Sequence, residues 1–111
     1  MRWLDRFIRP LDAHLLTELA ETIANDCHWE AWNRIVARTG TMASTPEAES
    51  YIRTRIAGVV RDRADQVIQM RTDVPHRALD TIVDTSLRII ATRLARPLLK
   101  RQAVWSYRRA S

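Results

Sequence analysis

Apolar side chains recur every three or four residues along most of this chain, which is the period of an α-helix with one buried face. Alternation of apolar and polar residues, the pattern of a half-buried strand, extends over no more than a few positions. We therefore predict an all-α fold, a compact antiparallel bundle of four to five helices with short loops. The length favours a single domain, residues 1–111, with the stretch 85–111 either inside the bundle or partly an extension of it.

The first predicted helix spans residues 2–9. Helical spacing places its apolar side chains on one face: Trp3, Leu4, Phe7 and Ile8. Pro10 either ends this helix or begins the next one, because proline is tolerated in a first turn.

A second helical region is predicted over residues 11–38. Its first half has an apolar side chain at every fourth position, namely Leu15, Leu19, Ile23 and Cys27. A shifted apolar face follows from Trp29, and the good capping residues Asn25 and Asp26 lie at the shift. The pattern therefore fits one long helix or two shorter ones, with Gly40 as a C-terminal stop.

The third helix has the clearest start signal. Ser44 and Glu47 have the spacing of a capping box, and Thr45 is an alternative cap with Pro46 in the first turn. Gly58 lies in the middle of this helix, where it could mark a close helix crossing. The expected buried stripe is Ile52, Ile56, Val59, Val60, Ala64, Val67 and Ile68.

Asp73 and Pro75 open the fourth predicted helix. Its expected buried stripe is Leu79, Ile82, Val83, Ser86, Leu87, Ile90 and Leu94. Pro97 is expected to end or kink this helix, because proline lacks the backbone donor and clashes with the preceding turn. A short last helix would then carry Leu98, Leu99, Val104 and Trp105.

Charge is distributed unevenly along the chain. The first 84 residues sum to −2, whereas the last 27 residues contain seven basic side chains and no acidic one. Such a stretch predicts a negatively charged partner, either nucleic acid or an acidic protein, with a membrane surface less favoured. The candidate contact residues are Arg88, Arg93, Arg96, Lys100, Arg101, Arg108 and Arg109. The alternative is a solvated helix face with no partner.

Large aromatic side chains are candidates for an interface. Trp29 and Trp32 are three residues apart and therefore share a helix face, either in the core or at a contact with another chain. The full set of candidate interface residues is Trp3, Phe7, Trp29, Trp32 and Trp105.

A loose helix-turn-helix pattern extends over residues 29–56, and the later helix carries basic residues that include Arg53, Arg55 and Arg61. The connector is longer than this motif normally has, and Asp62 and Asp65 interrupt the basic face. A core helix with charge pairs on its outer face is therefore the favoured interpretation.

Catalytic chemistry has little support in the sequence. The three histidines lack the spacing of a helical metal site, and two glycines cannot build a phosphate-binding loop. Cys27 and His28 are neighbours and point about 100° apart on a helix, so they do not form a nucleophile–base pair. We expect no enzyme activity, cofactor or metal. A single cysteine and no long apolar segment favour a cytoplasmic protein.

Two functional hypotheses follow. The first is a non-enzymatic helical module for protein–protein interaction that self-associates through its aromatic residues. The second is a nucleic-acid-binding regulator or accessory protein that contacts phosphates through its arginine-rich C-terminal stretch.

Overall fold

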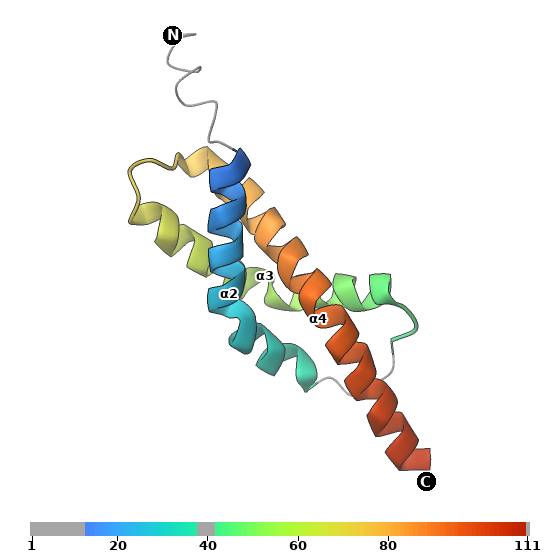
Figure 1. The fold of residues 1–111 in the computed structure, drawn as a ribbon. Helices are drawn as coiled ribbons and strands as arrows, with labels where there is room; N and C mark the ends of the chain where they lie inside the picture. Colours follow the sequence, from blue (N-terminus) through green and yellow to red (C-terminus); the bar gives the residue numbers. More distant parts are fainter. Residues whose placement is uncertain (1–12, 38–41, 111) are drawn as a thin grey trace.

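The computed structural model describes residues 13–37 and 42–110, together with all their side chains except those of residues 105–110. Three long helices pack together: α2 (Ala13–Val36), α3 (Thr45–Gln69) and α4 (Leu79–Ala110). A single 3-10 turn, η1 (His76–Ala78), precedes α4 (Figure 1). The predicted all-α class is confirmed over the described residues, but the count of four to five helices is not matched there. The helix predicted over residues 2–9 lies outside the described residues.

Residues 11–38 were open to one or two helices, and the structure contains one over this region. Its buried side chains continue at every fourth position through Ile23, Cys27, Ala31 and Ile35. Asn25 and Asp26 do not act as caps, because the helix continues through them and their exposed side chains contact other helices instead.

The start of α3 follows the predicted capping pattern. The backbone N–H of Glu47 donates to Ser44 Oγ at 3.3 Å, which satisfies one of the free donors of the first turn. Glu47 Oε2 accepts in return from the backbone N–H of Ala43 at 2.8 Å, one residue earlier than in the standard box. Ser44 rather than Thr45 is therefore the cap.

Pro97 was expected to end or kink the helix, and the expected end is wrong, because α4 continues through Pro97 and is 32 residues long in total. The separate last helix does not form, and its residues belong to α4. The physical reason lies in the packing on both sides of the proline. Leu94, Ala95 and Leu98 are all buried against the other helices, while the ring of Pro97 faces solvent. Burial of this apolar surface outweighs the lost backbone hydrogen bond.

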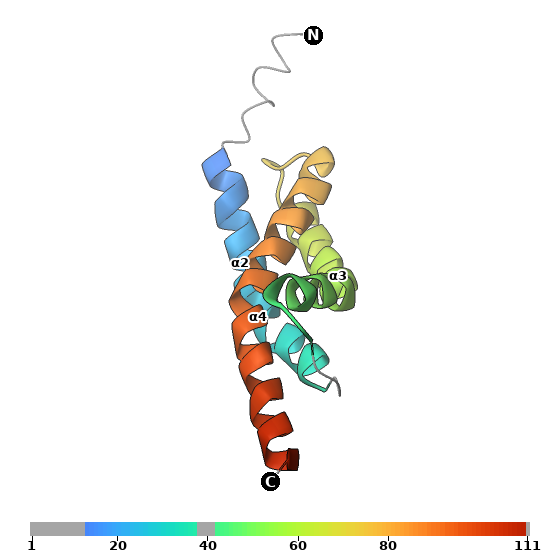
Figure 2. The same ribbon diagram turned by 90° about the vertical axis from the view of Figure 1, so that its right-hand side faces the viewer.

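The buried positions explain how the helices cross. In α3 they are Ala48, Ile52, Ile56, Val60, Ala64 and Ile68, a strict spacing of four. A row with this spacing is inclined to the helix axis, and rows of this kind pack with axes crossing at about −50° rather than nearly aligned. Accordingly, α3 runs obliquely across α2 and α4 (Figures 1 and 2).

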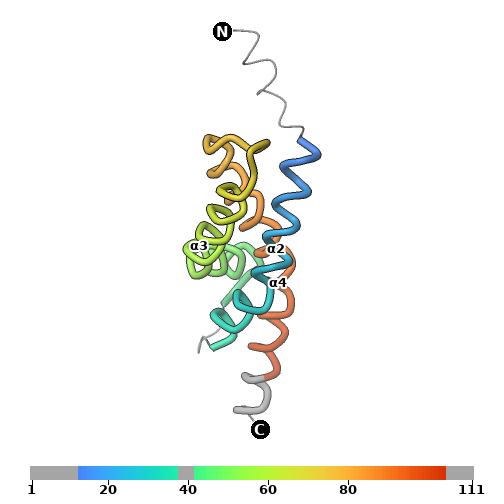
Figure 3. Tube along the Cα trace, turned by 90° about the vertical axis from the view of Figure 1, so that its left-hand side faces the viewer, coloured from blue at the N-terminus to red at the C-terminus, as the bar shows by residue number. Residues whose placement is uncertain are grey.

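The three helices form two layers around one core. α2 and α4 lie side by side in one layer, and α3 packs against one side of this pair (Figures 2 and 3). The principal extents are 67 × 22 × 17 Å. The C-terminal turns of α4 extend beyond the ends of the other helices (Figure 1). Much of the surface of α4 is therefore free for contact with other molecules.

Candidate interaction surfaces

The outer surface of α4 carries five exposed cations, Arg88, Arg93, Arg96, Lys100 and Arg101, which we call the basic face. Arg88, Arg96 and Lys100 lie on one row of four-residue spacing, and Arg93 and Arg101 lie on another. The buried residues of α4 form their own rows of the same spacing, from Ile82 to Leu98 and from Val83 to Ala95. All these rows wind around the helix together, so the basic side chains stay away from the core along its length.

Four arginines elsewhere in the described chain are neutralised by carboxylates, whereas Arg53, Arg55 and Arg77 form no described ion pair. Ion pairs join Arg34 to Glu30 at 3.2 Å, Arg61 to Asp80 at 3.1 Å, Arg63 to Asp26 at 2.9 Å and Arg71 to Asp73 at 2.8 Å. The cations of the basic face form no ion pair with any described residue. Arg93 Nη1 donates to Asn25 Oδ1 on α2 at 2.6 Å, but that amide carries no charge. The positive charge of the basic face therefore remains uncompensated.

Of the other predicted contact residues, some are described by their backbone alone and others lie outside the described residues. Trp105, Arg108 and Arg109 lie in the last turns of α4, but their side chains are outside the description. Trp3 and Phe7 lie outside the described residues altogether. In the region considered as a helix-turn-helix, Arg61 is bound to Asp80 of α4, which removes it from the set of free basic side chains on α3.

A second surface lies on α2, where Trp29, Trp32, Asn33 and Val36 share one side of the helix; we call it the Trp29 face. Trp29 is 71% exposed, and its ring meets the His28 ring edge-on at a centroid distance of 5.1 Å. Trp32 is half-buried and packs against the core. Trp29 is therefore a surface residue rather than a core residue. Trp32 connects the Trp29 face to the hydrophobic core. No member of the face carries a charge.

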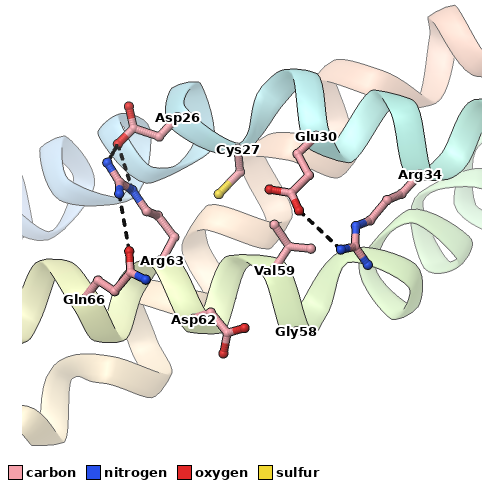
Figure 4. A pocket seen from close by; sticks show the side chains of 9 residues that line it. All are labelled: Asp26, Cys27, Glu30, Arg34, Gly58, Val59, Asp62, Arg63 and Gln66. Atoms are coloured by element: carbon pink, nitrogen blue, oxygen red, sulfur yellow. Dashed lines mark hydrogen bonds and ion pairs between the residues drawn. The ribbon is translucent and has the colours of Figure 1, made fainter.

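A polar groove of about 660 Å³ separates α2 from α3 (Figure 4). At one end, Arg63 donates through Nη2 and Nε to Asp26 Oδ2 at 2.9 and 3.2 Å. At the other end, Arg34 bonds to Glu30. The Arg63–Asp26 pair could not be predicted from the sequence, because its members are 37 residues apart and only the helix crossing brings them together.

The Cys27 thiol points toward this groove from α2 (Figure 4). Its burial raises the pKa of the thiol, and the nearby carboxylates of Glu30 and Asp26 raise that pKa further. The thiol is therefore protonated at neutral pH and is a poor nucleophile. Both of those carboxylates are already bonded to arginines.

Gly58 borders the groove on α3. A Cβ atom built at this position would meet nothing within 4 Å. The expectation that Gly58 marks a close helix crossing is therefore wrong, since neighbouring helices leave room for a side chain there.

Within the described ranges, His, Cys, Asp and Glu side chains form no group of three that could hold a metal ion. The described helices also include none that is long and apolar enough to cross a membrane. Comparison with known proteins finds no matching family model, no matching curated protein and no matching solved structure.

Proposed function

We propose that this chain is a non-enzymatic helical interaction module that self-associates through the Trp29 face. The observation that carries the proposal is the 71% exposure of Trp29 beside the uncharged side chains of Trp32, Asn33 and Val36 on α2. Tryptophan is enriched among the residues that dominate binding energy, and charged residues are depleted at the centres of interfaces.

A second copy can bind at the Trp29 face without bringing like charges together. The chain carries a net charge of +5, so two copies repel each other wherever their basic surfaces meet. The Trp29 face avoids this repulsion because none of its side chains is charged. A two-fold axis through this face places the same patch of each copy against the other, as in most homodimers.

Charge also favours an antiparallel alignment of the two copies. The N-terminal end of α2, which contains Glu18 and Glu21, and the N-terminal end of α4, which contains Asp84, lie near the same end of the molecule, while α4 extends toward the opposite end (Figure 1). Antiparallel copies bring the acidic end of one toward the basic end of the other. This arrangement selects the orientation, while burial of Trp29 supplies the affinity.

A role without catalysis agrees with the groove chemistry. The one thiol that points into the groove is held protonated, and the carboxylates of Asp26 and Glu30 are engaged by arginines. A protein–protein contact needs neither an activated nucleophile nor a free general base.

The proposal is tested by Trp29→Lys, which places a charge at the centre of the face. We expect the wild type to sediment at twice 12.9 kDa and the variant at 12.9 kDa. A dominant interface residue contributes about 2 kcal/mol per copy, so removing it from both copies weakens dimerisation close to a thousandfold. Sedimentation equilibrium over a range of protein concentrations measures the change.

Met70→Lys is the matched control. Met70 is 86% exposed at the end of α3, so the substitution adds the same charge to an exposed apolar position away from the Trp29 face. We expect this variant to dimerise almost as the wild type does. A wild type that remains monomeric at high concentration, or a dimer that Trp29→Lys leaves intact, contradicts the proposal.

A further inference from the structure

We infer that the basic face of α4 binds the phosphate backbone of duplex DNA without regard to base sequence. This is a second activity, located on a different helix from the Trp29 face. It rests on five exposed cations that no described carboxylate neutralises.

The dimensions of the basic face suit a duplex. Arg88 and Arg101 are 13 residues apart, which corresponds to about 20 Å along a helix at 1.5 Å per residue, and their side chains point about 140° apart, so the basic face curves around the outer side of α4. This length spans roughly six base pairs at 3.4 Å per pair. The helix is held on its other side by α2 and α3, so the cations project from a fixed support. Little conformational entropy of the backbone is lost on binding.

The types of side chain also favour phosphate. Four of the five cations are arginines, whose planar guanidinium donates two parallel hydrogen bonds to phosphate oxygens. Arg93 is already oriented by its bond to Asn25, and the guanidinium still has further donors for a ligand.

The residues between the cations of the basic face favour duplex DNA over a membrane surface or a single-stranded nucleic acid. Thr92 and Pro97 are the exposed residues there, and the apolar side of α4 is buried in the core. A membrane-surface helix needs an exposed apolar side to insert. Single-strand binding normally uses aromatic side chains for stacking, and α4 contains none between Arg88 and Arg101.

The test measures binding of a 20-base-pair DNA duplex by fluorescence anisotropy as a function of salt. The full-length protein is compared with Arg96→Gln/Lys100→Gln/Arg101→Gln. Each phosphate contact contributes about −0.9 to the slope of log K against log salt, so the five cations predict about −4.5. The triple variant removes three contacts, and its slope should be smaller in magnitude by about 2.7. At 0.1 M salt this corresponds to an affinity lower by about two to three orders of magnitude.

Arg53→Gln/Arg55→Gln/Arg77→Gln is the matched control. It removes the same charge from exposed arginines outside α4 that form no described ion pair. We expect it to keep a slope close to the wild type. An equal loss in both triple variants would show that net charge alone attracts DNA and would overturn the assignment to α4.

A conservative variant adds a second readout. Arg96→Lys/Arg101→Lys keeps both charges and so should keep the salt slope, while affinity falls with the loss of two-point hydrogen bonding. Two duplexes of unrelated sequence should bind equally. Tighter binding to oligo(dT), to vesicles containing phosphatidylserine or to polyglutamate at the same salt would overturn the choice of duplex DNA.

Self-association through the Trp29 face and DNA binding by the basic face can be tested independently of each other. The triple variant of the basic face should keep the oligomeric state of the wild type, and Trp29→Lys should keep the salt slope of each monomer. Loss of DNA binding by Trp29→Lys alone would show that the basic face does not bind DNA independently.

Discussion

At the scale of single residues, the surroundings of a side chain decide its role more than its type does. Trp29 and Trp32 are three positions apart on one helix, yet Trp29 is exposed and Trp32 packs on the core. Cys27 is a potential nucleophile by type, but its burial and two nearby carboxylates raise the pKa of the thiol. Gly58 occupies a helical position where a larger residue would fit.

Gly58→Ala should stabilise the fold. Alanine is favoured over glycine within a helix by about 1 kcal/mol, partly because the unfolded chain loses conformational freedom. The added methyl group meets no atom within 4 Å, so no steric cost offsets this gain. Urea unfolding should show a higher midpoint with an unchanged slope. A lower midpoint would mean that the groove beside Gly58 is narrower than the structure shows.

At the scale of the helices, a local signal sets the start of α3, whereas packing carries α4 through a local stop signal. The Ser44 cap and Glu47 define where α3 begins. Pro97 carries an equally strong local signal for a stop, but Leu94 and Leu98 are buried on either side of it. Tertiary packing therefore overrides the stop signal of Pro97. Burial contributes about 1.5–3 kcal/mol for each leucine.

Ser44→Ala should destabilise the fold by about 1 kcal/mol, because it leaves a first-turn backbone donor of α3 without its side-chain acceptor. Thr45→Ala is the matched control, since Thr45 lies just inside the helix and is not the cap. We expect Thr45→Ala to change the free energy of unfolding by less than Ser44→Ala does. Thermal or urea unfolding measures both variants, and the reverse order would identify Thr45 as the cap.

At the scale of the whole molecule, charge and shape separate two surfaces. The basic face spans residues 88–101 of α4, and the uncharged Trp29 face lies on α2. Proposed DNA binding and proposed self-association therefore use different helices. A dimer would carry two basic faces, so its apparent affinity for a long duplex would exceed that of a monomer.

Self-association predicts that stability depends on concentration. A dimer that dissociates on unfolding is stabilised by mass action, and a tenfold increase in protein should raise the melting temperature by roughly 3 °C for a domain of this size. Trp29→Lys should remove this dependence. Differential scanning calorimetry at several concentrations measures it, and a melting temperature of the wild type that does not change with concentration would contradict a dimer.

The sequence by itself determined the all-α class, the capped start of α3 and the basic character of α4. These are local properties, because helical period, capping and charge are carried by residues within one or two turns of each other. The positions of the buried rows were also largely predictable, since Ile52, Ile56 and Ala64 repeat at helical spacing.

Only the tertiary structure decided which charges are neutralised, which tryptophan is exposed and whether α4 continues past Pro97. The pairs Arg63–Asp26 and Arg61–Asp80 join different helices, so the spacing of residues along one helix cannot predict them. Trp29 and Trp32 have the same residue type and almost the same helical position. They differ in exposure because Trp32 packs against the core that all three helices build and Trp29 does not.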